Sequence, residues 1–345
     1  MSIAVQTPDE KLLSLRKPTV KLLGRLSLSS EDWLVVCGGF EDRALACIES
    51  ATADGSNVNL LLVNYLPFVD QNKANTIRSI CRSKNITILE ITYDRQEPAG
   101  FGEVFIEMVG GTHGHVFIDV SGMSRLLIVQ ILVALSRRPM RFHNCSIVYT
   151  EAASYPPSEN EAMEQLGKSE ADPSYSIYFL SSGVYEVTLI PELSSCAPAG
   201  GQTRLVAFPS LDSHQLTALR AELQPSRISL IEGIPPGAHN RWRLSAIADV
   251  NRLAEMQSAE RCPVSTLNYE ETLECLLKIY SEHGVYERLL ISPTGSKMQS
   301  VAVGLFRSFI VDTQVVYPTP RDFLKPQKYT EGIGPMHILP LEAFS

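Results

Sequence analysis

Long apolar runs and a leading secretory signal are missing from this chain of 345 residues. No apolar run reaches the ~18 residues that a membrane-spanning helix needs. The most apolar stretch, residues 126–135, stops shortly before Arg137 and Arg138. Residues 1–8 lack the charged segment and apolar run of a secretory signal. We therefore expect a protein that has no membrane partner.

Paired cysteines are also missing. The seven cysteines are scattered along the sequence, and no two of them form a Cys-x-x-Cys pattern. Zinc sites and disulfide frameworks show grouped or regularly spaced cysteines, so neither is indicated. Isolated cysteines inside apolar segments behave as small core residues. This pattern predicts no metal site and a reduced, cytoplasmic location.

Positive charge is scarce relative to negative charge. Lys and Arg total 30 against 38 Asp and Glu, which gives a net charge of −8 and an isoelectric point near 5.5. Extended nucleic-acid surfaces neutralise many phosphates with cations, so this balance argues against such a surface. It remains compatible with a small pocket in which a few cations bind one phosphorylated ligand.

The composition that is present, with 44% hydrophobic and 20% charged residues, is that of a globular protein long enough for two domains of ~150 residues. Short apolar segments alternate with helical patterns along both halves. This alternation predicts an α/β fold of two tandem Rossmann-like parallel-sheet halves. The expected strands are residues 33–37, 58–63, 86–91, 116–120 and 146–149, and then 205–208, 228–231, 264–267, 289–292 and 313–317.

The second half repeats polar residues of the first half at matching strand ends. Asp119-Val-Ser-Gly-Met-Ser-Arg125 follows the fourth expected strand of the first half, and Ser292-Pro-Thr-Gly-Ser-Lys297 follows that of the second. Each is a Ser/Thr-Gly turn that ends in a cation and opens an apolar helix. Several such matches in one order indicate that the halves are related by internal duplication.

The same pattern sets the expected domain boundaries. Residues 1–30 form a lead-in, and residues 31–193 form the first Rossmann-like domain with a polar insertion at 155–175. Residues 194–203 form a linker of small residues, Pro and Gly. Residues 204–345 form the second Rossmann-like domain. Segments 187–191 and 336–340 are expected to add a final strand, each to its own half.

Ligands of open parallel sheets bind beyond the carboxyl ends of the strands, where the strand order reverses. The Gly122 and Gly295 turns are the best candidates for contact with phosphate, because glycine lets backbone N–H groups approach an anion and the following helix start attracts it. The alternative is that glycine only tightens the turn and the nearby cation is solvated. The candidate ligand-binding residues are Arg43, Ser121, Gly122, Arg125, Asn240, Thr294, Gly295, Ser296 and Lys297.

Further pocket candidates are two histidines, His214 and His239, and two aromatic residues, Trp242 and Tyr269. An aromatic ring can stack on a base in a nucleotide site. At helical positions, however, aromatic residues such as Trp242 and Tyr269 more often belong to the core.

The turn Thr294-Gly-Ser-Lys297 resembles the Thr-Gly-Gly-Thr-Lys turn of CARF domains, the Rossmann-like sensors of cyclic oligonucleotides in prokaryotic immunity. Two such units in one chain resemble the SAVED arrangement. The resemblance covers the topology of both halves and this one motif, in which one Gly is missing. It implies that residues 294–297 line a ligand pocket, with residues 40–43 and 210–214 forming the other wall.

Three functions follow as hypotheses. The first is a nucleotide-sensing subunit of a prokaryotic defence or regulatory system, which binds a cyclic oligonucleotide or related phosphorylated ligand and acts through a protein partner or homo-oligomer. The second is an enzyme that hydrolyses or transfers a nucleotide or phosphodiester, with Glu41, Asp42 and Asp119 holding a metal or polarising water. The third is a non-catalytic interaction subunit of a defence complex.

The enzyme hypothesis has a structural alternative, in which these carboxylates cap helices or pair with Arg43 and Arg125. The chain carries no Walker loop, no Gly-x-Gly-x-x-Gly fingerprint and no Gly-x-Ser-x-Gly elbow. The sequence therefore identifies no cofactor.

Overall fold

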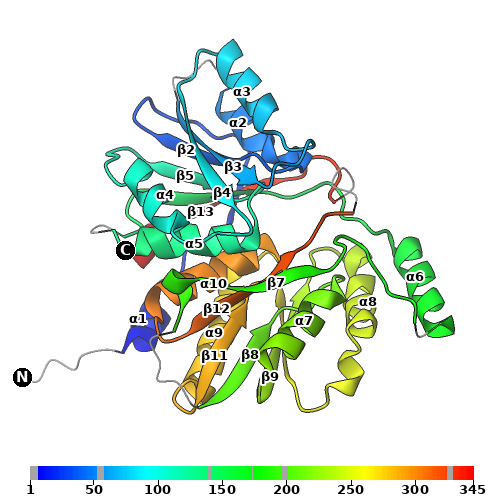
Figure 1. Cartoon of the computed structure of the whole chain (residues 1–345). Helices are drawn as coiled ribbons and strands as arrows, with labels where there is room; N and C mark the ends of the chain where they lie inside the picture. The colour runs from blue at the N-terminus through cyan, green and yellow to red at the C-terminus, as the bar shows by residue number, and fades with distance from the viewer. Residues whose placement is uncertain (1–6, 53–57, 139–140, 173, 196–200, 325–328) are drawn as a thin grey trace, which may run out of the picture. The chain divides into compact units, whose positions relative to one another are not determined.

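The computed structural model of the chain describes residues 7–52, 58–138, 141–172, 174–195, 201–324 and 329–345 (Figure 1). The chain divides into two compact units, and each unit is built from two separate stretches of sequence. Unit 1 contains Met1–Arg16 and Pro157–Leu324, and unit 2 contains Lys17–Pro156 and Lys325–Ser345.

Unit 2 is a seven-stranded sheet in the order β1-β13-β6-β5-β2-β3-β4. Strands β2 to β6 are parallel, whereas β13 runs antiparallel to β6 and β1 antiparallel to β13. Its strands are β1 (Lys21–Leu23), β2 (Trp33–Cys37), β3 (Asn59–Leu66), β4 (Ile88–Asp94), β5 (Val116–Asp119), β6 (Cys145–Thr150) and β13 (Met336–Pro340). Its helices are α2 (Ala46–Ala51), α3 (Ala74–Ser83), α4 (Phe101–Val109) and α5 (Arg125–Ser136), with short 3₁₀ turns η1 (Asp42–Ala44) and η6 (Glu342–Phe344).

Unit 1 is a six-stranded sheet in the order β10-β9-β8-β11-β12-β7. Strands β8 to β12 are parallel, and β7 runs antiparallel to β12. Its strands are β7 (Val184–Leu189), β8 (Gln202–Ala207), β9 (Arg227–Ile234), β10 (Glu260–Ser265), β11 (Glu287–Ser292) and β12 (Gln314–Pro320). Its helices are α1 (Pro8–Ser14), α6 (Glu159–Ala171), α7 (Ser213–Leu223), α8 (Trp242–Val250), α9 (Tyr269–His283) and α10 (Lys297–Phe309), with 3₁₀ turns η2 (Pro191–Leu193), η3 (Ala238–Asn240) and η4 (Leu253–Glu255).

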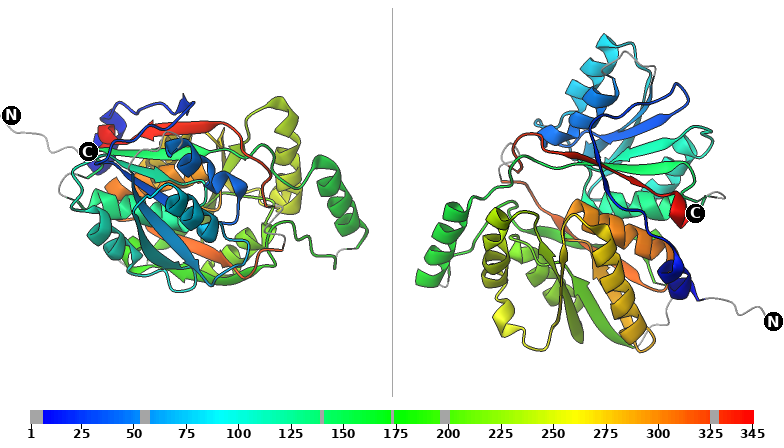
Figure 2. Two further views of the ribbon diagram at one scale, coloured as in Figure 1. Left: turned by 90° about the horizontal axis from the view of Figure 1, so that it is seen from above. Right: turned by 180° about the vertical axis from the view of Figure 1, so that it is seen from behind.

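Both units therefore have the predicted Rossmann-like α/β fold. In each, the five parallel strands follow the order third, second, first, fourth, fifth, and an antiparallel strand continues the sheet beyond the fifth. The view from behind in Figure 2 shows α9 and α10, in gold and orange, side by side over the unit 1 sheet. The central strands read as continuous buried apolar runs because helices cover both faces of such a sheet.

The antiparallel strands are exchanged between the two halves of the sequence. β7, which follows the first five strands along the chain, pairs with β12 in unit 1, whereas β13 pairs with β6 in unit 2. We expected the opposite, with 187–191 closing the first half and 336–340 closing the second. That expectation is wrong because adjacency in sequence does not decide which sheet edge a strand joins.

The exchange also moves the domain boundary. Residues 157–193, which the sequence assigned to the first domain, belong to unit 1 with the second sheet. Within the expected insertion, α6 packs against α8 of unit 1, and Arg243 donates a hydrogen bond to the carbonyl of Pro157 at 2.9 Å. Of the expected linker at 194–203, residues 196–200 lie outside the described residues.

Each unit has its own hydrophobic core. In unit 2, the buried side chains of Cys47 and Ile77 from α2 and α3 pack with Leu60 on the sheet. In unit 1, Leu216 of α7 packs with Leu205 of β8. Within the described part of the chain, no helix combines the length and the apolar character needed to cross a bilayer.

Candidate functional site

The two predicted glycine turns occupy equivalent places in their units. In unit 2 the turn joins β5 to α5, beside β2, and in unit 1 it joins β11 to α10, beside β8. In both sheets this is where the strand order reverses, the usual ligand position of such folds. Ser124 and Ser296 cap the two helices through their side-chain oxygens.

The unit 2 turn is filled by its own backbone. A Cβ atom added to Gly122 would lie 2.6 Å from the carbonyl oxygen of Cys37 at the end of β2. A Cβ on Gly39 would in turn lie 2.6 Å from the carbonyl oxygen of Gly122. Glycine is required here because two backbones approach closely, which is the structural alternative to phosphate contact.

Polar groups around the unit 2 turn are also bonded to one another. The buried Asp119 carboxylate accepts hydrogen bonds from the backbone N–H and the hydroxyl of Ser121. The Ser121 hydroxyl oxygen accepts from the N–H of Thr150 at 2.8 Å. At the helix start, the N–H of Ser124 donates to the hydroxyl of Tyr65. The backbone N–H groups of Ser121 and Ser124 and the hydroxyl of Ser121 are therefore engaged within the protein.

Arg43 lies in a buried network rather than in an open pocket. Its guanidinium forms an ion pair with Glu41 at 2.6 Å and donates to the hydroxyls of Tyr149 at 3.1 Å and Tyr155 at 3.3 Å. Thr330 donates to the same Glu41 carboxylate at 3.0 Å. Burial alone would lower the pKa of Arg43, but the charge of Glu41 and the two tyrosines raise it above its ordinary value.

The three carboxylates of the enzyme hypothesis have three different sets of partners. Glu41 pairs with Arg43, Asp119 accepts from Ser121, and the more exposed Asp42 pairs with Lys73 at 2.9 Å. Among the described residues, no group of three or more His, Cys, Asp or Glu side chains could hold a metal ion. Glu41 and Asp42 thus form ion pairs, whereas Asp119 accepts hydrogen bonds from Ser121.

In unit 1, the hydroxyl groups of the turn fix its backbone. The buried Thr294 hydroxyl donates to the carbonyl of Phe208 at 2.8 Å, which ties the turn to the end of β8. The Ser296 hydroxyl donates to the carbonyl of Thr266 and accepts from the N–H of Gln299 at 3.1 Å. Lys297, the first residue of α10, is half-buried.

Gln299 is the distinctive residue of the unit 1 turn. Its side-chain Oε1 accepts from the N–H of Ser296 at 2.8 Å and completes a capping box. Its Nε2 has no hydrogen-bond partner, although the residue is only 2% exposed. A Cβ on Gly233, at the end of β9, would lie 3.4 Å from this nitrogen. A buried donor therefore faces the carboxyl edge of the unit 1 sheet without an acceptor.

Sequence reasoning missed Gln299, although a signal was present. Ser296-x-x-Gln299 is the Ser/Thr-x-x-Glu/Gln pattern that marks a capping box before an apolar helix. The pattern predicts where the side-chain oxygen goes. It does not predict that the nitrogen stays without a partner.

Buried polar atoms without partners gather in unit 1. Near the carboxyl edge, they include Ser292 Oγ at the end of β11, which is fully buried. Gln299 Nε2 is another atom of this kind. Three more lie around the β8–α7 loop: His214 Nε2, Gln215 Oε1 and Asn251 Oδ1. Native proteins leave few such atoms unsatisfied, and each calls for an explanation such as a bound ligand or water.

In each unit, the segment just before the exchanged strand packs on the loop that follows the first parallel strand. In unit 2, Tyr329 packs edge-on against Phe40, and the adjacent Thr330 bonds to Glu41. In unit 1, Tyr178 stacks on His214 at 4.8 Å, and the hydroxyl of Ser181 donates to Asp212 at 3.2 Å. Burial, the largest effect, lowers the pKa of His214. The internal repeat therefore extends to these covering segments.

Four further candidates, Asn240, His239, Trp242 and Tyr269, lie outside the two glycine turns, whereas Arg125 ends the unit 2 turn. Asn240 is half-buried in η3 and donates to the carbonyl of Pro236 at 3.2 Å, beside the exposed His239. Arg243 lies over the ring of Trp242 at 4.6 Å. Tyr269 is 1% exposed and belongs to the core, as its helical position allowed. Arg125 is half-buried at the start of α5.

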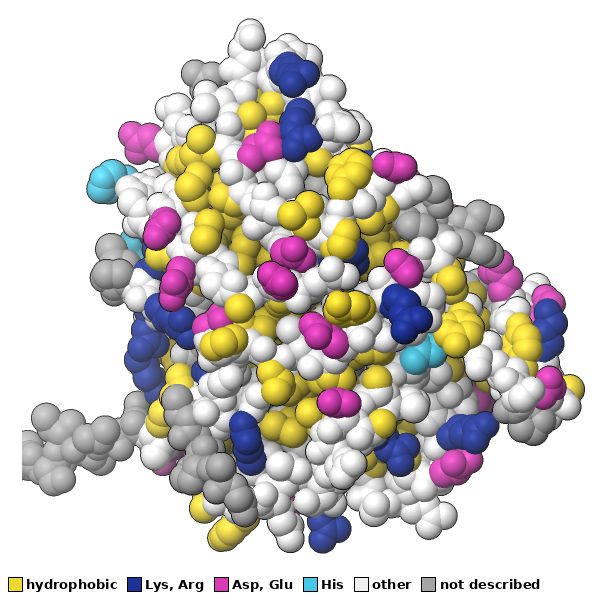
Figure 3. Space-filling model, in the orientation of Figure 1, with side chains coloured by type: hydrophobic (Ala, Val, Ile, Leu, Met, Phe, Trp, Pro, Cys, Tyr) yellow, Lys and Arg dark blue, Asp and Glu magenta, His cyan; other side chains and the backbone are white. Residues whose placement is uncertain are grey.

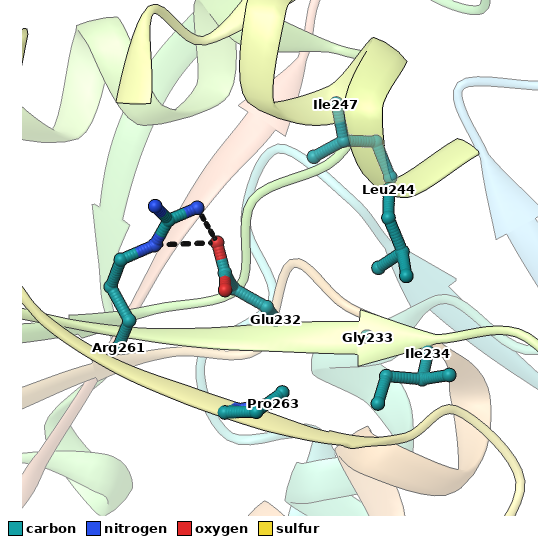
Figure 4. Close-up of a pocket in the computed structure, with 7 residues that line it drawn as sticks. All are labelled: Glu232, Gly233, Ile234, Leu244, Ile247, Arg261 and Pro263. Carbon is teal, nitrogen blue, oxygen red and sulfur yellow. Dashed lines mark hydrogen bonds and ion pairs between the residues drawn. The ribbon is translucent and has the colours of Figure 1, made fainter. Parts of the chain in front are cut away.

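A separate cavity of about 150 Å³ lies between α8 and strands β9 and β10 (Figure 4). Leu244 and Ile247 of α8 face Ile234 and Pro263 across it. An ion pair between Glu232 and Arg261 lies at one side. None of the sequence candidates lines this cavity.

The face drawn in Figure 3 carries Asp and Glu side chains among its Lys and Arg side chains. This mixing accompanies the net charge of −8. A surface that follows a nucleic-acid backbone depends instead on grouped cations.

No protein-family model matches the chain, and no curated protein does. Among solved structures, the chain is similar to the cytoplasmic domain of a prokaryotic cation chloride cotransporter, with a TM-score of 0.24, 8% identity, and 84% of this chain and 95% of that one covered. It is also similar to Haemonchus contortus phosphoethanolamine N-methyltransferase 1, with a TM-score of 0.21, 10% identity, and 90% and 77% covered. A C2-type ketoreductase from a modular polyketide synthase gives a TM-score of 0.21, 10% identity, and 87% and 80% covered. Similarities at these scores carry no argument about function.

Proposed function

We propose that this protein senses a nucleotide-type phosphorylated ligand, such as a cyclic oligonucleotide, at the carboxyl edge of the unit 1 sheet. The observation that carries the proposal is the buried Gln299 Nε2 without an acceptor at the start of α10. Gln299 follows directly after the turn 294–297, which resembles the ligand-binding turn of CARF domains, and its side chain bonds back to Ser296 of that turn. The sensor would belong to a prokaryotic defence or regulatory system and act in the cytoplasm.

The chemistry of this edge suits an anion. A phosphate oxygen accepts hydrogen bonds, and Gln299 Nε2 is a donor whose isolation costs about 1–3 kcal/mol. Lys297 adds a full positive charge one residue after the cap. The 13-residue helix α10 directs the positive end of its dipole to the same place. Ser292 Oγ, buried at the end of β11, offers a further donor.

The proposal assigns the two turns different tasks. The unit 2 turn engages its own donors and packs two glycines against facing backbone, so its role is structural. Unit 1 retains several buried polar atoms without partners. The signal would pass to a partner protein or a second copy of the chain, because binding alone performs no chemistry. No observation favours the phosphodiester-cleaving alternative over this one.

Thermal-shift and calorimetric titrations with cyclic and linear nucleotides test the proposal. A ligand present at 100 times its Kd stabilises the folded state by about 2.7 kcal/mol, so one nucleotide class should raise the melting temperature clearly. Gln299→Glu is the sharpest variant, since a glutamate keeps the capping oxygen and replaces the buried donor by an acceptor. We expect Gln299→Glu and Lys297→Ala to abolish the shift.

Arg125→Ala is the matched control, because Arg125 holds the equivalent place in unit 2. It should leave the ligand-induced shift intact. If no nucleotide stabilises the protein, or if Arg125→Ala abolishes the shift while Lys297→Ala retains it, the assignment to unit 1 fails. Metal-dependent turnover of a bound nucleotide that disappears in Asp119→Ala would instead support the enzyme alternative.

A further inference from the structure

Helix α9 runs back along the edge strand β10 of unit 1, and two contacts fix its register. At one end, the N–H of Ser265 donates to the Glu271 carboxylate at 2.7 Å. At the other end, the ring of His283 lies 3.2 Å from the Glu260 carboxylate. Residues midway along the helix must therefore lie beside residues midway along the strand.

Two cysteines meet at that midpoint. Arg261 and Pro263 of β10 line the cavity beneath α8, and successive strand residues point to opposite faces. Cys262 therefore points to the other face, where α9 packs. There its side chain is hydrogen-bonded to that of Cys275. Both thiols are reduced, Cys262 is half-buried and Cys275 is buried.

We propose that Cys262 is an oxidation site for hydroperoxides and that Cys275 resolves it to an intramolecular disulfide. The Cys262 thiolate attacks one oxygen of hydrogen peroxide, the O–O bond breaks, and the departing hydroxide takes up a proton to leave as water. The Cys275 thiol then attacks the resulting sulfenic sulfur, an S–S bond forms, and a second water leaves. Two electrons pass from the thiol pair to the peroxide.

The surroundings of Cys262 favour the reactive thiolate. The hydrogen bond with Cys275 lowers the pKa of Cys262 to about 7, although burial opposes this, and the charge of Lys278 lowers it further. The same hydrogen bond raises the pKa of Cys275, so one member of the pair attacks while the other stays protonated. The negative charge of Glu260, on the same strand as Cys262, also raises the pKa of Cys275.

The geometry also suits a disulfide. Bridged cysteines need Cβ atoms within roughly 4.5 Å, a spacing that thiols in hydrogen-bonding contact can reach. The bond would join an edge strand, held by β9 on one side only, to the helix that packs on it. Oxidation would therefore restrain β10 on one face while Arg261 and Pro263 keep their places at the cavity on the other.

To test this, the full-length protein is treated with hydrogen peroxide. The thiols that remain are then labelled with N-ethylmaleimide under denaturing conditions. Wild type should take up two fewer labels per chain, and peptide mapping should recover a fragment that links Cys262 to Cys275. Cys262→Ser should show no such loss. Cys275→Ser should accumulate sulfenic or sulfinic acid at Cys262 without the link. Cys81→Ser, which removes a buried cysteine of unit 2, is the matched control and should behave as wild type.

Alkylation kinetics provide the second measurement. At pH 7 the thiolate fraction of Cys262 should be roughly 15-fold above that of an ordinary thiol, and its lower nucleophilicity should reduce the rate advantage to about threefold. Cys275→Ser should remove this advantage. Unchanged labelling after peroxide, loss of labels in Cys262→Ser, or sulfinic acid at Cys262 in wild type without a link would each overturn the proposal.

Discussion

At the scale of single residues, Arg43 shows how a cation in a candidate site can be structural. The residue is 3% exposed and is surrounded by a carboxylate, two tyrosine hydroxyls and the carbonyl of Thr150. These contacts, and the bond from Thr330 to Glu41, are made within unit 2. Breaking one side of such a pair leaves an uncompensated charge, which costs far more than losing an exposed ion pair.

We therefore expect Arg43→Met to lower the free energy of unfolding by about 3–5 kcal/mol. Arg78→Met is the matched control, because Arg78 pairs with Glu90 at 2.7 Å at the surface of the same unit. Its cost should be about 0–1 kcal/mol. Urea unfolding measures both, and the double variant Arg43→Met/Glu41→Gln should recover part of the loss. Equal effects of Arg43→Met and Arg78→Met would contradict the role given to Arg43.

At the scale of elements, the two glycine turns differ in what their glycines meet. Gly122 lies against the backbone of β2, where no flexible side chain can move aside. Gly295 lies against the Gln299 amide and the ring of Phe208. The first contact fixes the spacing of β2 and β5, whereas the second concerns side chains that a ligand can rearrange.

Two Gly→Ala substitutions separate packing from helix propensity. Gly122→Ala should lower the free energy of unfolding by about 1–3 kcal/mol, because its Cβ meets the Cys37 carbonyl at 2.6 Å. Gly167→Ala should raise it by roughly 0.5–1 kcal/mol, since Gly167 lies inside α6 with nothing within 4 Å of an added Cβ. Chemical denaturation of both variants gives the comparison. A stabilising Gly122→Ala would show that the turn has room for more than its own backbone.

Elements at sheet edges were the ones that the sequence predicted poorly. Strand β10 begins at Glu260, four residues before the expected strand, and contains Pro263. Edge strands tolerate polar residues and proline, so they lack the apolar run by which a buried strand is recognised. The same reason explains why the outermost strand β1 went unpredicted, whereas the central β2 was predicted at its observed bounds.

At the scale of the whole molecule, the sequence predicted two Rossmann-like halves but not the exchange of their last strands. Alternating apolar segments indicate which strands are buried. Burial is a local property, and the central strands of both sheets have it. The choice of β12 or β6 as the neighbour of β7 depends on which edges lie open, and no single segment carries that information. The candidate turns were placed correctly at the strand ends, yet the bond from Thr330 to Glu41 joins distant segments, and the burial of Gln299 Nε2 without a partner depends on packing.

The exchange predicts where a strand-breaking substitution acts. Ile338→Pro removes a backbone donor from β13, which pairs with both β1 and β6. Hydrogen exchange should then accelerate in peptides that cover β1 and β6 and stay unchanged in those that cover β8 to β12. Ile333→Pro, outside any strand in the same arm of unit 2, is the control and should have little effect. Faster exchange in β12 after Ile338→Pro would instead support the expectation from sequence that residues 336–340 pair within the second half.

The exchanged strands also set the order in which the molecule can be finished during its synthesis. β6 leaves the ribosome long before β13, so its open edge must wait while the whole second sheet is translated. β7 emerges early as well, before any strand of the sheet that it completes. Open edges of this kind invite wrong pairing with other chains. A nascent chain of this protein therefore holds two incomplete sheets at once. The sheet of unit 2 can be completed only after β13 has been synthesised.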